Sequence, residues 1–309
     1  MKTLAHTLIC LVGLGAALWP VAGWAHSGQG GIEQAPVGIA QALFLLAWLV
    51  YTVGAAGQRP RFGLRLALHT AMLITGLALF GPLDELSDRS AAWHMVQHML
   101  LMVVVTPLLV LARPLPQWRA VLGPRADGLW RALHRLSRRP MVCALLHAVA
   151  IWFWHAPGPY IAALQSPSWH VLEHACFLFS GWLFWWSVLR PGRTAALPAA
   201  GALLFTVMHT GLLGALLSFA KLPLYSVALS ALADQQLAGL VMWVPGGLVY
   251  LLAAVGAASR WLASLETPPT SRRQVAPRSG RLGGWQVLHP AGREPPGEQG
   301  ACAEQAAQE

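Results

Sequence analysis

The sequence predicts an all-α fold: a polytopic membrane helix bundle with seven transmembrane helices after a signal peptide. Of its 309 residues, 56% are hydrophobic and only 11% are charged, whereas a soluble domain carries about 25% charged residues. The apolar residues form runs of about the length that spans a bilayer. Most basic residues lie outside these runs, as expected for the loops on one side of a membrane. Together these observations exclude an ordinary soluble protein.

The first 25 residues are typical of a secretory signal peptide. Lys2 precedes an apolar stretch, and Gly23-Trp24-Ala25 offers small residues at a cleavage point before His26. An uncleaved first span is the alternative. If cleavage follows Ala25, the mature chain begins with His26, whose free amine and imidazole can chelate copper together.

Seven apolar segments of spanning length follow the leader. Together with the leader, these segments divide the chain into a predicted signal peptide over residues 1–25, a membrane domain over 26–261 and a cytoplasmic tail over 262–309. The tail is rich in Pro, Gly, Arg, Gln and Glu, and we expect it to be disordered because it cannot bury enough apolar surface to fold alone. The predicted spans cover residues 36–56, 64–82, 92–112, 141–161, 169–189, 196–219 and 236–259.

The positions of the basic residues predict the orientation. Of 21 Lys and Arg, 18 fall in residues 57–65, 113–140, 190–193 and 260–293, which the positive-inside rule assigns to the cytoplasm. The loop 81–91 holds three acidic residues against one arginine and is expected outside. We therefore expect a multi-pass protein in the lipid bilayer of the cell inner (plasma) membrane, with its N-terminus outside and its C-terminus cytoplasmic. Basic loops this short form no folded basic face, so no nucleic-acid partner is expected.

Histidines near the outer ends of the predicted spans are the most informative polar residues. One pair lies four residues apart in the third span and a second pair repeats the spacing in the fifth, so each pair shares one helix face. A methionine continues the first face by another turn. The candidate metal ligands at this outer level are His94, His98, Met102, His155, His170, His174, His209 and Asp234.

A shared metal ion would give these side chains the partners that lipid cannot offer. A water-filled polar cavity, a proton path and unrelated packing are the alternatives. Four cysteines without a CxxC pair argue against a thiolate zinc site. Methionines beside the imidazoles, Met102 above all, favour cuprous copper, Cu(I), whereas zinc does not call for methionine. His69 and His147 lie nearer the middle or the inner half and are left out of this site.

Two proline positions predict kinks or local unwinding. Pro107 lies within the third predicted span, and Pro245-Gly246-Gly247 lies within the seventh. Backbone hydrogen bonds lost there are tolerated only where neighbouring helices or a cavity compensate. We expect the seventh span to bend around the site, with close helix packing at the glycines as the simpler interpretation.

Three motifs resemble the CtaG family of cytochrome c oxidase assembly proteins. They are His-Met-Val-Gln-His-Met-Leu-Leu (94–101), Trp-His-x-x-Glu-His (169–174) and the segment from Asp234 to Gly247 that ends in Val-Pro-Gly-Gly. The resemblance covers about residues 36–260. It implies a seven-span protein, not an enzyme, that helps to mature a haem-copper oxidase by bringing copper to it. The implied partners are oxidase subunits and periplasmic copper chaperones. The positions that match the family are His94, Gln97, His98, His155, His170, Glu173, His174, His209, Asp234 and Gln235.

Three functions remain open from the residues themselves. The first is a copper-handling assembly factor that holds Cu(I) through the two histidine pairs and Met102. The second is an intramembrane zinc-dependent hydrolase, in which three histidines and Asp234 hold zinc and activate water. The third is bis-histidine haem binding between the third and fifth spans. Metal analysis and a visible spectrum of the purified protein discriminate among them.

Overall fold

The structure, a computed structural model, describes residues 35–190, 196–225 and 232–266. The predicted signal peptide, His26 and almost all of the predicted tail lie outside this part of the chain. The described residues form helices and contain no strand, which confirms the all-α class. The last helix, α14 (Gly247–Glu266), continues past residue 261, where the membrane domain was predicted to end.

Five stretches of the described residues are long and apolar enough to cross a membrane. The two helices α9 (Pro140–Trp154) and α10 (Pro157–Gln165) pass the same test together, although they are bent by 69° at their junction. Helix α11 (Pro167–Leu189) is 23 residues long but is not in this set. Polar residues in its first two turns lower its mean hydropathy. The five stretches are Ala35–Gln58 (α2), Phe62–Leu79 (α3), Ala91–Ala112 (α5, η2 and α6), Ala196–Ser218 (α12) and Leu232–Ala263 (α13, η5 and most of α14).

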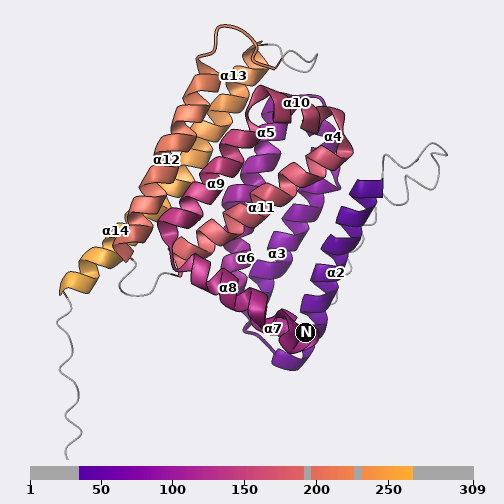
Figure 1. Ribbon diagram of the computed structural model, residues 1–309, viewed down its shortest axis with the longest axis vertical. Coiled ribbons are helices and arrows are strands. Elements are labelled where there is room, and N and C mark those ends of the chain that lie inside the picture. Colours follow the sequence, from indigo (N-terminus) through magenta and orange to yellow (C-terminus); the bar gives the residue numbers. More distant parts are fainter. Residues whose placement is uncertain (1–34, 191–195, 226–231, 267–309) are drawn as a thin grey trace, which may run out of the picture. The chain divides into compact units, whose positions relative to one another are not determined.

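Short helices lie at the two ends of these long helices (Figure 1). At one end, α4 (Pro82–Ser87) and α10 lie near the start of α5 (Ala91–Met99). At the other end, α7 (Leu115–Leu122) and α8 (Asp127–Ser137) are joined by the short 3₁₀ helix η3 (Gly123–Ala126). The two ends are chemically different: acidic residues lie on α4, and arginines lie on α7 and α8.

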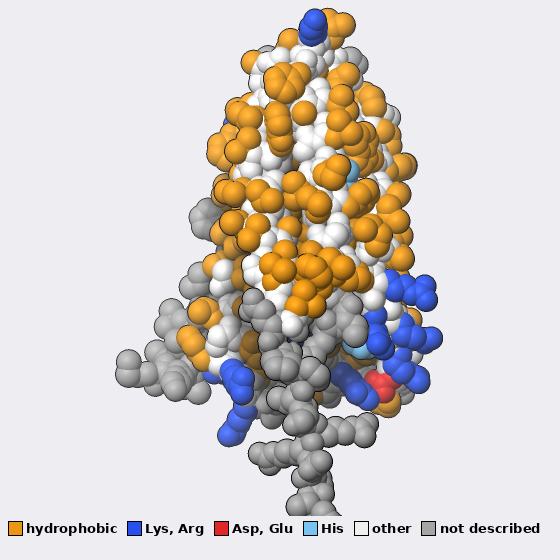
Figure 2. Space-filling view, turned by 90° about the vertical axis from the view of Figure 1, so that its left-hand side faces the viewer, with side chains coloured by type: hydrophobic (Ala, Val, Ile, Leu, Met, Phe, Trp, Pro, Cys, Tyr) orange, Lys and Arg blue, Asp and Glu red, His pale blue; other side chains and the backbone are white. Residues whose placement is uncertain are grey.

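The sides of the helices expose hydrophobic residues, as a membrane environment requires. Figure 2 shows orange hydrophobic side chains along the flank and blue Lys and Arg gathered at its lower end. On α2, Ile39, Leu43 and Leu49 are 60%, 61% and 58% exposed. Such a large apolar surface is not tolerated in water by a monomeric protein, so these helices are suited to contact lipid.

Both proline positions are accommodated by a wider helical turn. Residues Leu100–Val105 (η2) form a π-helix directly before α6 (Thr106–Ala112), whose second residue is Pro107. Residues Met242–Gly246 (η5) form another, with Pro245 inside it. A proline lacks the N–H donor and crowds the carbonyl four residues back, and a π-turn relieves this locally. The predicted local unwinding is confirmed in this form at both places.

The fourth predicted span, 141–161, is not one straight helix. Helix α9 ends at Trp154, His155 caps it, and Ala156 is extended before Pro157 begins α10. The residue before a proline is driven out of the α conformation, which explains the break. As a result, His155 lies at the bend between two helices rather than within a span.

Close packing of two glycines fixes the position of α13 (Leu232–Val241) beside α12. A Cβ atom built on Gly239 would lie 2.6 Å from the Gly214 carbonyl oxygen, and one built on Gly214 would lie 2.9 Å from the Gly239 carbonyl oxygen. Only residues without a side chain allow the two backbones to approach this closely. Helix α13 also contacts α5, which carries the first histidine pair.

Candidate metal centre

Helix α5 carries the first histidine pair, and its N-terminus is capped by a residue of α13. The carboxylate of Asp234 on α13 accepts hydrogen bonds from the Ser90 hydroxyl (2.7 Å) and from the backbone N–H groups of Ala91 (2.6 Å) and Ala92 (3.4 Å). Helix N-termini leave such N–H groups without partners, and a carboxylate there is favoured by the helix dipole. His94, one turn into this helix, has its ring 4.2 Å from that of His98, between centroids.

Helix α11 presents the second pair against the first. Pro167 begins this helix, and one turn later the rings of His170 and His174 lie 4.3 Å apart. The His170 ring stacks on the His94 ring at 5.4 Å, and the His174 ring meets the His98 ring edge-on at 5.3 Å. The two predicted pairs therefore face each other across the bundle.

Glu173 lies between the two histidines of α5. Its Oε2 atom is 3.7 Å from His94 Nε2, and its Oε1 atom is 3.8 Å from His98 Nε2. These distances are too long for hydrogen bonds. Two donor atoms that each lie about 2.1 Å from a tetrahedral ion would be about 3.4 Å apart, which is close to what is observed. His94, His170 and Glu173 each offer one ligand atom within 4.8 Å of the other two.

His155 extends the cluster from the bend between α9 and α10. Its ring lies 6.4 Å from that of His98, and its Nδ1 atom is 2.8 Å from the Ile151 carbonyl oxygen. A carbonyl oxygen only accepts hydrogen bonds, so Nδ1 must carry the proton. The Nε2 atom of the neutral ring is then a free lone pair, which is the arrangement usual for a metal-ligating histidine.

The cluster contains polar atoms that the protein leaves without hydrogen bonds. Within the described residues, eight buried side-chain atoms of this cluster have no hydrogen-bond partner. Each such atom costs about 1–3 kcal/mol when it is left unsatisfied, so their concentration at one point makes the cluster the candidate ligand site of the described chain. They are Nε2 of His94, His155, His170 and His174, both ring nitrogens of His98, and both carboxylate oxygens of Glu173.

The two histidines excluded by depth differ in this respect. His69 Nδ1 accepts a hydrogen bond from the Trp48 indole at 2.9 Å. His147 lies 2.9 Å from the Ser180 hydroxyl and 3.4 Å from the Tyr250 hydroxyl. Both are therefore core histidines with partners of their own, and leaving them out of the predicted site agrees with the structure.

Three predicted ligands lie elsewhere than in the cluster. The ring contact of His209 is with Phe205, at 5.0 Å. Met102 is fully buried in the hydrophobic core, and its carbonyl oxygen accepts hydrogen bonds from Thr106 and Trp185. Asp234 uses both carboxylate oxygens to cap α5. The structure thus joins five of the six predicted histidines and leaves these three residues in other environments.

Glu173 was not among the predicted ligands, although the family resemblance included its position. Its signal in the sequence is the spacing of His170, Glu173 and His174. Residues at i, i+3 and i+4 share one helix face, so a carboxylate at i+3 accompanies both histidines wherever they point. At 1% exposure it is among the most buried polar side chains described.

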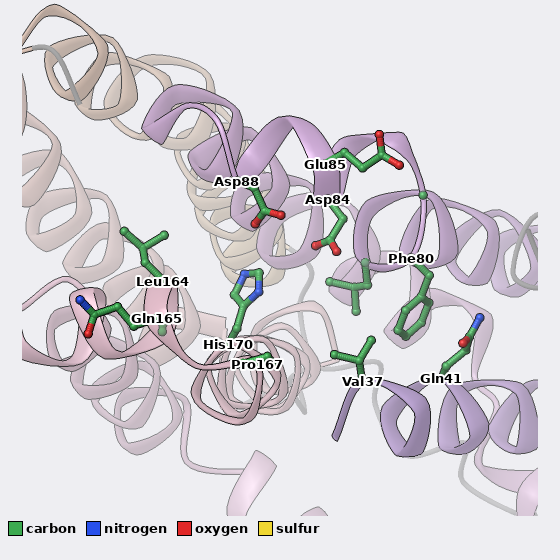
Figure 3. Close-up of a pocket in the computed structure, with 13 residues that line it drawn as sticks. Val37, Gln41, Phe80, Asp84, Glu85, Asp88, Leu164, Gln165, Pro167 and His170 are labelled. Atoms are coloured by element: carbon green, nitrogen blue, oxygen red, sulfur yellow. The ribbon is translucent and has the colours of Figure 1, made fainter. Parts of the chain in front are cut away.

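An acidic pocket leads to the cluster (Figure 3). Its volume is about 530 Å³. Asp84 and Glu85 of α4 and Asp88, the residue after this helix, line the pocket together with His170. The side chains of Asp84 and Asp88 point toward the same space as the His170 ring, whereas Glu85 points away. Burial raises the pKa of Asp84 to about 6, while a 2.9 Å hydrogen bond from Gln97 acts in the opposite direction. Burial also raises the pKa of Asp88.

A second pocket of about 600 Å³ reaches the cluster from the side, and it is apolar. Residues of α2, α3 and α11, among them His170 and His174, line it together with Asp84, which also lines the acidic pocket. His170 therefore belongs to the cluster and to both pockets. It is the member of the cluster best placed to meet an incoming ligand.

The fold and the cluster define a helix bundle of membrane type with a buried histidine–glutamate site. Residues 40–264 match the sequence model of the cytochrome c oxidase caa3 assembly factor family, Caa3_CtaG. The chain belongs to this family, as its motifs predicted. No curated protein and no solved structure matches the chain significantly. The geometry described above is therefore interpreted on its own chemistry.

Proposed function

We propose that this cytochrome c oxidase assembly factor binds copper in the histidine–glutamate cluster and passes it to an oxidase subunit. The observation that carries the proposal is the set of eight buried donor atoms without hydrogen bonds around Glu173. Imidazole nitrogen is a good ligand for copper and zinc. Membership of an oxidase assembly family favours copper, because the family resemblance implies a haem-copper enzyme as the recipient.

The number of donors supports transfer rather than permanent storage. Six side chains surround a point where a tetrahedral ion would use four. His94, His170 and Glu173 form one set of ligand atoms. His98 and the two rings near it, those of His155 and His174, form a second set. Glu173 faces both sets with its two oxygens. An ion can therefore exchange ligands one at a time between the two sets without leaving the site.

The acidic pocket supplies an access route for a cation. Clustered negative charge raises the local concentration of cations, and the Asp84 and Asp88 side chains point toward the space that His170 lines. His170 is also a member of the first ligand set. Copper that enters through this pocket would meet His170 first and then His94 and Glu173.

Metal analysis of the purified protein tests the proposal. We expect close to one copper per chain in the wild type and loss of that copper in the double variant His98→Ala/His174→Ala. His209→Ala is the matched control, because this histidine lies in a span but outside the cluster, and it should keep its copper. Electron paramagnetic resonance separates Cu(II) from Cu(I) in the purified protein.

Several results would contradict the proposal. Wild-type copper content in the double variant would refute the site. Zinc in place of copper, together with turnover of an amide or ester lipid, would establish the hydrolase alternative. A Soret band in the purified protein would establish haem binding.

We further propose that the chain crosses the membrane seven times after a cleaved signal peptide, with the cluster at the outer face. In this topology α11 and the α9–α10 pair cross in addition to the five apolar stretches. The support comes from arginines on α7 and α8 at one end and acidic residues on α4 at the other. Reporter fusions after residues 88 and 135 should report opposite sides of the membrane, and the same side for both would refute this topology.

A further inference from the structure

At the end of the bundle opposite the cluster, α7 and α8 form a basic layer. Seven arginines lie between residues 113 and 139. The blue side chains at the lower right of Figure 2 gather at this end, below the hydrophobic flank. Short helices that connect two spans are natural interfacial elements, and the chemistry of this layer is specific enough to indicate a ligand.

A pocket of about 1210 Å³ opens in this layer. Its basic residues come from two different elements: Arg119 from α7, and Arg131, His134 and Arg135 from α8. Among the described residues that line this pocket, Asp127 is the one acidic residue. Three guanidinium groups thus face one carboxylate, and the pocket has an excess of positive charge at neutral pH.

The hydrogen bonds of the arginines leave donors for an anion. Arg131 and Arg135 use their Nε atoms to donate to the backbone carbonyls of Asp127 and Arg131, both at 3.3 Å. These bonds hold the side chains along α8 and involve none of the terminal NH₂ groups. Arg119 donates one terminal N–H to Asp127 at 2.7 Å. Guanidinium groups bind phosphate through paired N–H donors, and several such donors converge on this pocket.

Apart from Gln58, the remaining lining residues of the pocket are hydrophobic. Leu115, Pro116, Ala120 and Trp186 line its wall. On the same two helices, Leu122 of α7 and Leu129 of α8 are 49% and 59% exposed. The Trp118 and Trp130 rings stack at 6.5 Å, and tryptophan is enriched at the level of lipid headgroups. A soluble phosphate would use only the basic part of this pocket, whereas a phospholipid would use both parts.

We infer that this pocket binds an anionic phospholipid, with the headgroup phosphate on Arg119, Arg131 and Arg135 and acyl chains along the Leu115–Trp186 wall. Basic pockets at the cytoplasmic ends of membrane helices bind anionic headgroups in this way. The lipid would connect α7 and α8 to the end of α11, whose other end carries the second histidine pair. The inference is independent of copper binding.

Native mass spectrometry of the full chain, released from detergent with defined lipids, tests the inference. The probes are phosphatidylglycerol and phosphatidylcholine with identical acyl chains, and glycerol phosphate as a soluble headgroup. We expect the wild type to retain phosphatidylglycerol at least tenfold better than phosphatidylcholine. Arg119→Gln/Arg131→Gln/Arg135→Gln should abolish this preference. Arg138→Gln/Arg139→Gln, exposed arginines of the same loop outside the pocket, should keep it.

A variant with increased affinity keeps the test decisive if the triple variant fails to fold. Asp127→Asn removes the carboxylate that competes for Arg119, so retention of phosphatidylglycerol should rise several-fold, which misfolding cannot produce. Equal retention of the two lipids by the wild type would overturn the inference, as would unchanged retention in the triple variant. Glycerol phosphate binding as tightly as the lipid would replace the lipid site by a phosphate site. Copper content should stay at the wild-type level in all these variants, so this result is separate from the test of the metal site.

Discussion

Replacement of Asp234 tests whether this residue is a metal ligand or the cap of α5. Its predicted depth in the membrane suggested a ligand. Its two oxygens accept short hydrogen bonds from the Ser90 hydroxyl at 2.7 Å and the Ala91 N–H at 2.6 Å. The capped helix carries His94 and His98. We expect Asp234→Ala to destabilise the protein without removing a copper ligand.

The magnitude of this effect follows from the two short bonds. Hydrogen bonds to a charged group contribute about 1.5–3 kcal/mol each, and because Asp234 is only half-buried the lower value applies. Two bonds then contribute about 3 kcal/mol, and the interaction with the helix dipole adds about 0.3–1 kcal/mol. For a chain of this size, 1 kcal/mol corresponds to about 2–4 °C in Tm. The Asp234→Ala protein without metal should therefore melt on the order of 10 °C below the wild type.

The assay is thermal unfolding of the metal-free protein in detergent, combined with copper titration. Copper stoichiometry and the copper spectrum should remain those of the wild type. A double-mutant cycle with Ser90→Ala sharpens the result, because Ser90→Ala should cost little once Asp234 is gone. The reasoning is refuted if Asp234→Ala melts within 2 °C of the wild type and loses its copper, since that is the behaviour of a ligand.

Two further predictions concern the acidic pocket and the helix packing. Because the folded protein raises the pKa of Asp84 from 3.8 to about 6, it holds this proton more tightly than the unfolded chain does. Stability should therefore fall by on the order of 3 kcal/mol as pH rises from 4 to 7. Asp84→Asn should remove this part of the pH dependence of Tm, and an unchanged profile would contradict the assignment. Gly239→Ala should destabilise by about 1–3 kcal/mol because its Cβ would meet the Gly214 carbonyl. Gly201→Ala, with open space around it, should be neutral or stabilising in the same melting experiment.

Hydropathy was sufficient to find the helices but not their local geometry. Each of the seven predicted spans overlaps a long helix, because an apolar run of this length has few other structures open to it in lipid. The 69° bend after Trp154 could not be read from hydropathy, since residues on both sides of it are apolar. Pro157 indicated that the helix ends there, but the direction of α10 depends on its packing against α11.

Depth and helix phase explain which of the predicted residues the structure brings together. Spacing of four residues fixes a common face, and orientation fixes a common depth, so both histidine pairs were found. Depth says nothing about rotation of a helix about its own axis, and for this reason His209 was included although its ring packs on Phe205. Met102 was placed on the His98 face by the 3.6-residue period, but Met102 lies inside the π-helical segment Leu100–Val105, where that period no longer holds.

Within the described residues, the protein itself offers no hydrogen-bond partner to eight buried side-chain atoms of the cluster. Eight unsatisfied buried atoms at about 1 kcal/mol each are comparable to the entire net stability of an ordinary domain, about 5–15 kcal/mol. His147, a core histidine outside the cluster, instead lies within hydrogen-bond distance of the Ser180 and Tyr250 hydroxyls, so the chain can supply partners to a buried imidazole. The cluster lacks such neighbours around Glu173, where two helices bring four imidazoles and one carboxylate together with His155. The proposed copper ion would supply that missing stabilisation, and a site with more donors than one ion needs is suited to receive an ion and release it to a better-matched acceptor.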